Sequence, residues 1–192
     1  MEAFSDGVIA ILITVMILEL HIPHGTDWGA IRPVVPALLT YVLSFIFLGI
    51  YWNNHHHLLT TVERVNGGIL WANLHLLFWL SLVPFVTGWM GQNSFQALPT
   101  AMYGANLFMA GIAYLILQTV IIRTQGKGSR LEVAVGRDIK GKLSGVSYAV
   151  ASPLAFVSRW VALGIYVCVV LMWLVPDRRI EAQVEPRGAS SI

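Results

Sequence analysis

Charged side chains are scarce in this sequence. Asp, Glu, Lys and Arg make up only 11% of its 192 residues, whereas hydrophobic residues make up 56%. The mean hydropathy is +0.69, well above what a soluble domain of this size needs to fill one core. These proportions exclude a soluble globular domain and predict an integral membrane protein.

Cysteine and the usual catalytic motifs are also lacking. The single cysteine, Cys168, cannot form an internal disulfide and has no Cys or His near it in the sequence, so we interpret it as a small apolar filler. We find no glycine-rich phosphate loop, no intramembrane carboxylate pair and no well-placed Ser-His-Asp combination. The stretch from Gly7 to Leu18 holds no carboxylate, which argues against a proton-coupled transporter. We predict a protein that is not an enzyme and uses no cofactor or bound metal.

Long uncharged runs are present instead, and they divide the chain into candidate membrane-spanning helices. About 20 apolar residues cross the hydrocarbon core as a helix, and the run from Val65 to Ile122 alone has 58 uncharged residues, enough for two crossings. Pro153 and Arg159 favour a hairpin over one long helix near the end of the chain. The candidate ranges are Phe4–Leu20, Pro33–Val62, two helices within Val65–Ile122, Leu143–Ser158 and Trp160–Pro176. The sequence therefore predicts an all-α protein with six transmembrane helices in residues 1–176 and a disordered cytoplasmic tail in residues 177–192.

Basic side chains are distributed unequally over the loops of this six-helix map. With the N-terminus inside, ten lie in the second loop, the fourth loop and the tail, and two lie in the outer loops. The ten are Arg64, Arg123, Lys127, Arg130, Arg137, Lys140, Lys142, Arg178, Arg179 and Arg187, and the two are Arg32 and Arg159. Loops rich in Lys and Arg remain in the cytoplasm, so we predict a plasma-membrane protein with both termini cytoplasmic. The fourth loop could also be a nucleic-acid or lipid-headgroup patch, but we favour a topology determinant and expect no nucleic-acid partner.

Polar residues stand at the ends of the first two predicted helices. Asp6 begins the first apolar run, and the second run ends near His55, His56 and His57. On the predicted map they lie at similar depth, and polar groups in a helix bundle must find one another. We therefore predict a hydrogen-bond or ion-pair network between the two helix ends. Three consecutive histidines point in three directions on a helix, so this stretch alone does not make a metal or haem site.

An apolar stripe runs along the first predicted helix. At about 100° per residue, Phe4, Ile11, Val15 and Leu18 fall within about 60° of one another, and Asp6 points away from them. Thr14 lies beside the stripe and adds a hydroxyl. Periodicity alone favours a lipid-facing or packing surface here.

Two segments and two shorter matches form a recognisable pattern. The first segment is Ala3-Phe4-Ser5-Asp6-Gly7-Val8-Ile9-Ala10-Ile11 followed by Thr14, and the second is Gly49-Ile50-Tyr51-Trp52-Asn53-Asn54-His55-His56. Asn73 and Leu82-Val83-Pro84-Phe85 follow on the third predicted helix. Together they resemble the bacterial branch of the transmembrane protein 175 family of potassium channels, which is known from lysosomes and bacteria.

The resemblance implies an assembly and a mechanism. Six-helix subunits would form a homotetramer whose first helices line a central pore, with Ile11 as the narrowest ring, Val15 and Leu18 further outward, and Thr14 contributing to selectivity. Apolar rings have no oxygen that replaces an ion's hydration shell, so they favour potassium moderately over sodium. The implied function is a potassium leak channel, with potassium ions, further copies of the chain and membrane lipids as partners. A membrane redox or metal-handling protein built on the helix-two histidines is the alternative.

The resemblance also assigns a network between the helices. Its members are Phe4, Ser5, Asp6, Trp52, His55 and Asn73. The family's arginine four residues before the phenylalanine falls ahead of Met1 in this sequence. A start assigned too late, an engineered sequence or a true variant would each explain this. If the arginine is absent from the protein, we expect Asp6 to contact His55, Trp52 or a neighbouring amide in its place.

Overall fold

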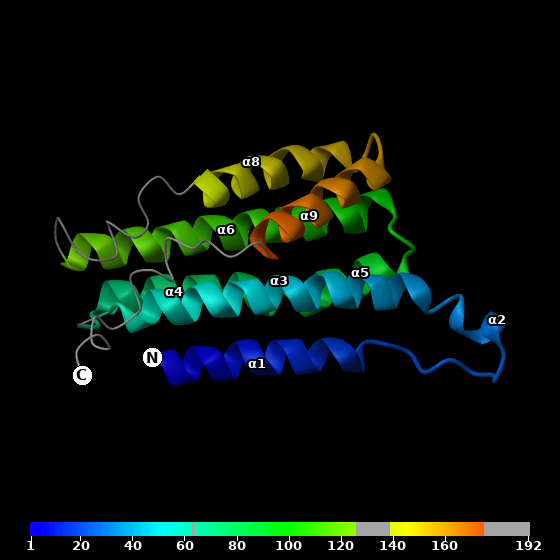
Figure 1. The fold of residues 1–192 in the computed structure, drawn as a ribbon, viewed down its shortest axis with the longest axis horizontal. Helices are drawn as coiled ribbons and strands as arrows, with labels where there is room; N and C mark the ends of the chain where they lie inside the picture. The colour runs from blue at the N-terminus through cyan, green and yellow to red at the C-terminus, as the bar shows by residue number, and fades with distance from the viewer. Residues whose placement is uncertain (63, 126–138, 175–192) are drawn as a thin grey trace, which may run out of the picture.

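The computed structural model describes residues 1–62, 64–125 and 139–174, whose long helices run side by side in an antiparallel bundle (Figure 1). The helices are α1 (Glu2–Leu18), α2 (Trp28–Ile31), α3 (Val35–Thr60), α4 (Gly67–Ser81), α5 (Val83–Gln92), α6 (Ala97–Gln125), α8 (Ile139–Leu154) and α9 (Arg159–Leu174). No strand occurs within these described ranges. The all-α prediction is confirmed for this part of the chain.

Three stretches of the bundle are long and apolar enough to cross a membrane. They are α3, the α4–α5 stretch Gly67–Gln92, and α6. α9 is a shorter apolar helix, and α1 has 17 residues. These helices support the predicted membrane protein, while the number of six crossings stays a prediction.

The third predicted helix is broken at Leu82, which the uncharged run did not reveal. Pro84 has no N–H and its ring disfavours a regular turn before it. The Leu82 N–H bonds the Trp79 carbonyl at 3.3 Å, and the Asn106 side chain of α6 donates to the same carbonyl at 3.2 Å. The Trp79 carbonyl at the break therefore accepts one hydrogen bond from its own chain turn and one from α6.

The turn after α5 begins beyond Gly88 and Gly91, which both lie inside the helix. The chain reverses after Gln92, where Ser94 and Phe95 adopt positive φ angles of 48° and 59°. The predicted terminal hairpin is present, because α8 ends at Leu154 and α9 begins at Arg159. Local turn geometry, rather than glycine content, separates these helices.

Helix α6 lies in the middle of the packing, and α1 and α8 lie at opposite edges (Figure 1). α6 packs against α4, α5, α8 and α9, whereas α1 packs against α3, α4 and α5. One buried cluster joins α1, α3, α4, α6 and the first residue of α5, and a second joins α3, α5, α6, α8 and α9. α1 is thus covered from one side only.

The helix ends divide between the two ends of the bundle. At one end of the bundle lie the starts of α1, α4 and α8 and the ends of α3 and α6 (Figure 1). The link through α2 lies at the other end. Of the ten basic residues predicted to be inside, Arg64, Arg123, Lys140 and Lys142 belong to the first group of helix ends. The predicted tail, residues 177–192, lies outside the described residues, as do Lys127, Arg130, Arg137, Arg178, Arg179 and Arg187.

Candidate functional site

Helix α1 has one buried face and one uncovered face. Its buried residues are Ser5, Ile9, Leu12 and Met16. The predicted apolar stripe lies on the uncovered face, where the exposed fractions of Phe4, Ile11, Val15 and Leu18 are 59, 61, 37 and 80%. Among the described residues, little covers Phe4, Ile11 and Leu18, whereas Val15 also lines a hollow with Ser81 and Phe85 of the α4–α5 stretch. The exposed surface of the stripe is available to lipid, water or another copy of the chain.

Small side chains accompany the stripe on the same uncovered face. Ala3, Gly7 and Ala10 are exposed, as is Thr14, whose hydroxyl donates to the Ile11 carbonyl at 2.9 Å. This bond fixes the position of the hydroxyl, and its oxygen retains lone pairs that accept hydrogen bonds. The face therefore presents one ordered oxygen among apolar groups.

A buried chain of hydrogen bonds joins α1, α3 and α4. His55 Nε2 lies 2.7 Å from Asn73 Oδ1, Asn73 Nδ2 donates to Ser5 Oγ at 2.9 Å, and Ser5 Oγ donates to the Met1 carbonyl at 3.2 Å. The exposed fractions of these three side chains are 0 to 2%. Because the Asn73 oxygen only accepts, His55 carries its proton on Nε2 in this arrangement. The structure thus brings three of the predicted network residues together.

Breaking this chain at its centre is expected to destabilise the subunit. Asn73→Ala leaves the His55 Nε2 donor without its partner, while the Ser5 hydroxyl keeps its bond to the Met1 carbonyl, and a buried unpaired group costs about 1–3 kcal/mol. The free energy of unfolding in detergent is the measurement. Asn93→Ala is the matched control, because the exposed Asn93 side-chain amide donates to the Trp89 carbonyl in its own turn. We expect this control to change stability by less than about 0.5 kcal/mol. Equal losses in the two variants would contradict a structural role for the buried chain.

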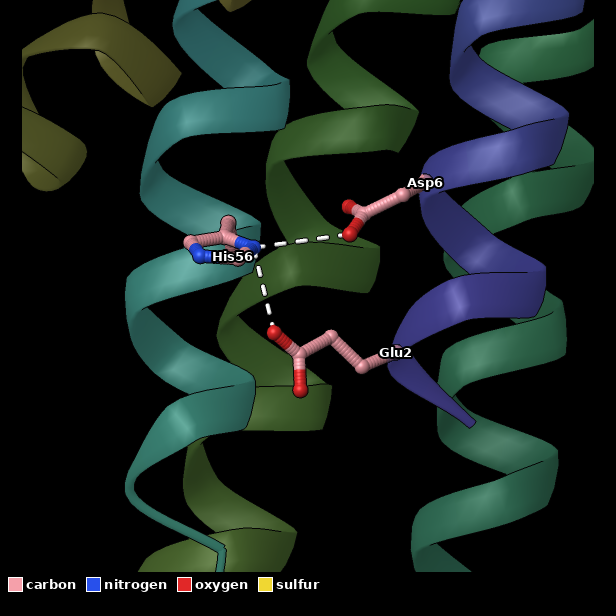
Figure 2. Close-up of side chains that lie close together, drawn as sticks. All are labelled: Glu2, Asp6 and His56. Carbon is pink, nitrogen blue, oxygen red and sulfur yellow. Dashed lines mark ion pairs between the residues drawn. The ribbon is translucent and has the colours of Figure 1, made fainter.

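Two carboxylates on α1 face a histidine on α3 (Figure 2). His56 Nδ1 lies 3.2 Å from Glu2 Oε1 and 3.4 Å from Asp6 Oδ2. The three side chains are part-exposed, so a protonated His56 gains only modest ion-pair energy here. Their ligand atoms lie within 4.8 Å of one another, and they are the group that could hold a metal ion among the described residues.

The expectation about the partner of Asp6 is wrong. Asp6 contacts His56, and neither His55, Trp52 nor an amide forms a hydrogen bond or ion pair with it in the described part of the chain. The reason is geometric, because His55 turns into the bundle toward Asn73 and its neighbour then faces α1.

Of the two remaining network residues, Trp52 lies beside the cluster of Glu2, Asp6 and His56, and Phe4 does not. The Trp52 ring lies 5.8 Å from the His56 ring between centroids. Phe4 is exposed on the stripe and joins neither group. Sequence reasoning missed the role of Glu2, although its four-residue spacing from Asp6 places both carboxylates on one helix face.

Known proteins are similar to this chain along nearly its whole length. Residues 1–84 match the family model of the endosomal/lysosomal potassium channel TMEM175. A potassium channel of Chryseobacterium sp. is 51% identical over 185 residues, with 96% of each chain covered, and one of Streptomyces collinus is 32% identical over 168 residues, with 82% of each covered. The crystal structure of a lysosomal potassium-selective channel TMEM175 homologue from Chamaesiphon minutus shares the fold, with a TM-score of 0.76, 23% identity, and 93% of this chain and 95% of that chain covered. The chain therefore belongs to the TMEM175 family of ion channels and is not an enzyme.

Proposed function

We propose that four copies of this chain form a potassium-permeable leak channel in the plasma membrane. Each copy would cross the membrane six times within residues 1–176, and the α1 helices would line a shared central pore. The observation that carries this proposal is the uncovered face of α1, which keeps its apolar stripe outside the packing of its own subunit. The names of the potassium channels to which the chain is similar support potassium as the permeant ion.

The stripe supplies the proposed constriction. Ile11 would form the narrowest ring, and Val15 and Leu18 would form rings nearer the end of α1 that leads to α2. Such rings penalise the loss of an ion's hydration shell, and potassium holds its shell less tightly than sodium. Selectivity would therefore be moderate, and the Thr14 hydroxyl would add an oxygen next to the Ile11 ring. This mechanism requires no cofactor.

The distribution of basic residues supports the proposed orientation. Arg64, Arg123, Lys140 and Lys142 belong to helix ends that point the same way as the start of α1 (Figure 1). Arg32 and Arg159 belong to the opposite end. Because basic residues accumulate on the cytoplasmic side, both termini would be cytoplasmic.

Flux measurements test the function directly. Liposomes that contain the purified chain are expected to release potassium faster than sodium, and both faster than protein-free liposomes of the same lipid. Ion-selective electrodes follow the two ions in parallel. Equal release with and without the protein would refute the channel, and sodium release as fast as potassium release would refute the selectivity.

Cysteine cross-linking tests whether α1 lies between copies. In a Cys168→Ser background, Ile11→Cys is expected to form covalent dimers on mild oxidation, because four Ile11 side chains would meet at one ring. Ile116→Cys on α6 is the matched control, since Ile116 is also exposed, at 40%, but belongs to a different helix. Denaturing gels without reductant give the result. Dimers from Ile116→Cys alone would place the contact between copies elsewhere.

A further inference from the structure

A cavity of about 490 Å³ lies between α3, α6, α8 and α9. Its wall is almost entirely apolar and includes Phe47, Phe108, Val146, Tyr148 and Trp173. This volume falls within the range of small-molecule sites, which are mostly apolar with a few polar groups. In a membrane the cavity has to be filled, because an apolar void loses contacts along its lining.

Glycines keep the cavity open. Gly111 of α6 and Gly141 and Gly145 of α8 belong to its wall. A Cβ atom built on Gly145 meets nothing within 4 Å, and one built on Gly111 meets only the Tyr51 hydroxyl oxygen, at 3.9 Å. The backbone at Gly111 and Gly145 therefore faces unfilled space, and a larger side chain would occupy it.

Positive charge stands at one end of the cavity. Lys142 belongs to the wall, is exposed, and forms no ion pair with a described carboxylate. Lys140 Nζ lies 5.9 Å from the centroid of the Trp173 ring, and the Trp173 indole N–H donates to Ser144 Oγ at 2.8 Å. These residues begin α8 or end α9, toward the same end of the bundle as the start of α1 (Figure 1). An apolar cavity with a lysine at one end is suited to a ligand that has an apolar chain and an anionic headgroup.

We propose that this cavity binds an acyl chain of an anionic phospholipid of the cytoplasmic leaflet, with the lipid phosphate beside Lys142. Anionic lipids are concentrated in that leaflet, and basic pockets between helices on that side bind their headgroups. The Lys142 side chain has an apolar stem that lies along the cavity while its ammonium reaches the headgroup region. The cavity lies on the α8 side of the bundle, away from α1, so lipid binding is separable from conduction.

Native mass spectrometry of the detergent-solubilised full chain tests the proposal. Palmitoyl-oleoyl phosphatidylglycerol is titrated against palmitoyl-oleoyl phosphatidylcholine, which has the same chains and no net charge. We expect saturable binding of phosphatidylglycerol with an affinity at least fivefold higher than that of phosphatidylcholine, since one Lys near the surface contributes about that factor. Equal affinity for the two lipids would overturn the proposal.

Two variants with matched controls locate the site. Gly145→Leu fills the cavity and is expected to weaken phosphatidylglycerol binding at least tenfold, because about two methylene groups of the chain lose their place. Gly164→Leu on α9 is its control, since a Cβ there also meets nothing within 4 Å and Gly164 is not part of the wall. Lys142→Gln is expected to abolish the preference for phosphatidylglycerol, and Arg159→Gln, at the other end of the bundle, to preserve it.

Folding and binding are kept apart by size-exclusion profiles and helical circular dichroism of each variant. Lys142 is exposed, and glutamine keeps most of its apolar stem, so Lys142→Gln tests the headgroup contact even if Gly145→Leu does not fold. Wild-type affinity in folded Gly145→Leu, or an unchanged lipid preference in Lys142→Gln, would overturn the proposal. None of these outcomes depends on ion flux, so a failure here leaves the channel proposal to its own test.

Discussion

Replacing Ile11 by asparagine is expected to increase potassium flux through reconstituted protein about tenfold, which corresponds to a barrier lowered by about 1.4 kcal/mol. In the proposed pore, four Ile11 side chains form a ring that offers a passing ion no oxygen. An amide at each position supplies donors and acceptors that hold water in the ring, so the ion loses less of its hydration shell. The same change is expected to bring the potassium-to-sodium flux ratio closer to one.

The control for this experiment is Ile17→Asn. Ile17 lies on the same helix and is also exposed, at 51%, but it points about 120° away from Ile11 at about 100° per residue. We expect its flux to remain within about twofold of the native value, because it lies outside the stripe. Native flux in Ile11→Asn, with unchanged assembly, would remove Ile11 from the conduction path. Increased flux in both variants would point to general leakiness of the altered bundle.

Gly91→Ala is expected to destabilise the folded chain by about 1–3 kcal/mol, the range for overpacked cores. A Cβ atom at Gly91 would lie 2.7 Å from the Cα atom of Ala37 and would also clash with the Thr40 hydroxyl. Ala37 opposes the new methyl with backbone, which cannot rotate away, so α3 and α5 must separate. Thermal unfolding in detergent, followed by circular dichroism, measures the loss.

Gly49→Ala provides the matched comparison on α3. A Cβ there meets nothing within 4 Å, and alanine is favoured over glycine in a helix interior by about 0.5–1 kcal/mol. The two identical substitutions should therefore shift the unfolding temperature in opposite directions. A decrease of similar size in both would show that the spacing of α3 and α5 is not set by Gly91.

Much of the bundle was predictable because its helices follow the uncharged runs closely. α3 lies within the second predicted range, and Pro153 and Arg159 correctly indicated the hairpin between α8 and α9. The break at Leu82 was not predictable from hydropathy, since a proline is tolerated inside a membrane helix when the backbone groups around it find partners. Asn106, whose side chain donates to the Trp79 carbonyl at the break, is distant in the sequence. The sequence also did not reveal that Gly91 allows the close approach of α3 and α5.

The sequence predicted which residues belong to the candidate site better than it predicted which of them contact one another. The resemblance grouped Ser5, His55 and Asn73, and the structure joins them by hydrogen bonds. Which of three adjacent histidines meets Asp6 depends on the rotation of α3 about its axis, and that rotation is set by packing along the whole helix. A sequence pattern does not contain this angle. The roles of Ile11, Val15, Leu18 and Thr14 in conduction stay predictions.

The one-sided packing of α1 has a consequence for how activity depends on dilution. In the proposed assembly, the wall of the conduit forms only where copies of the chain meet, so a single copy has no conduit. The association equilibrium between copies therefore sets the amount of conducting protein. As lipid is added at constant protein, the flux per copy of the chain should fall once the copies dissociate. For a subunit that enclosed its own conduit, the flux per copy would instead stay constant.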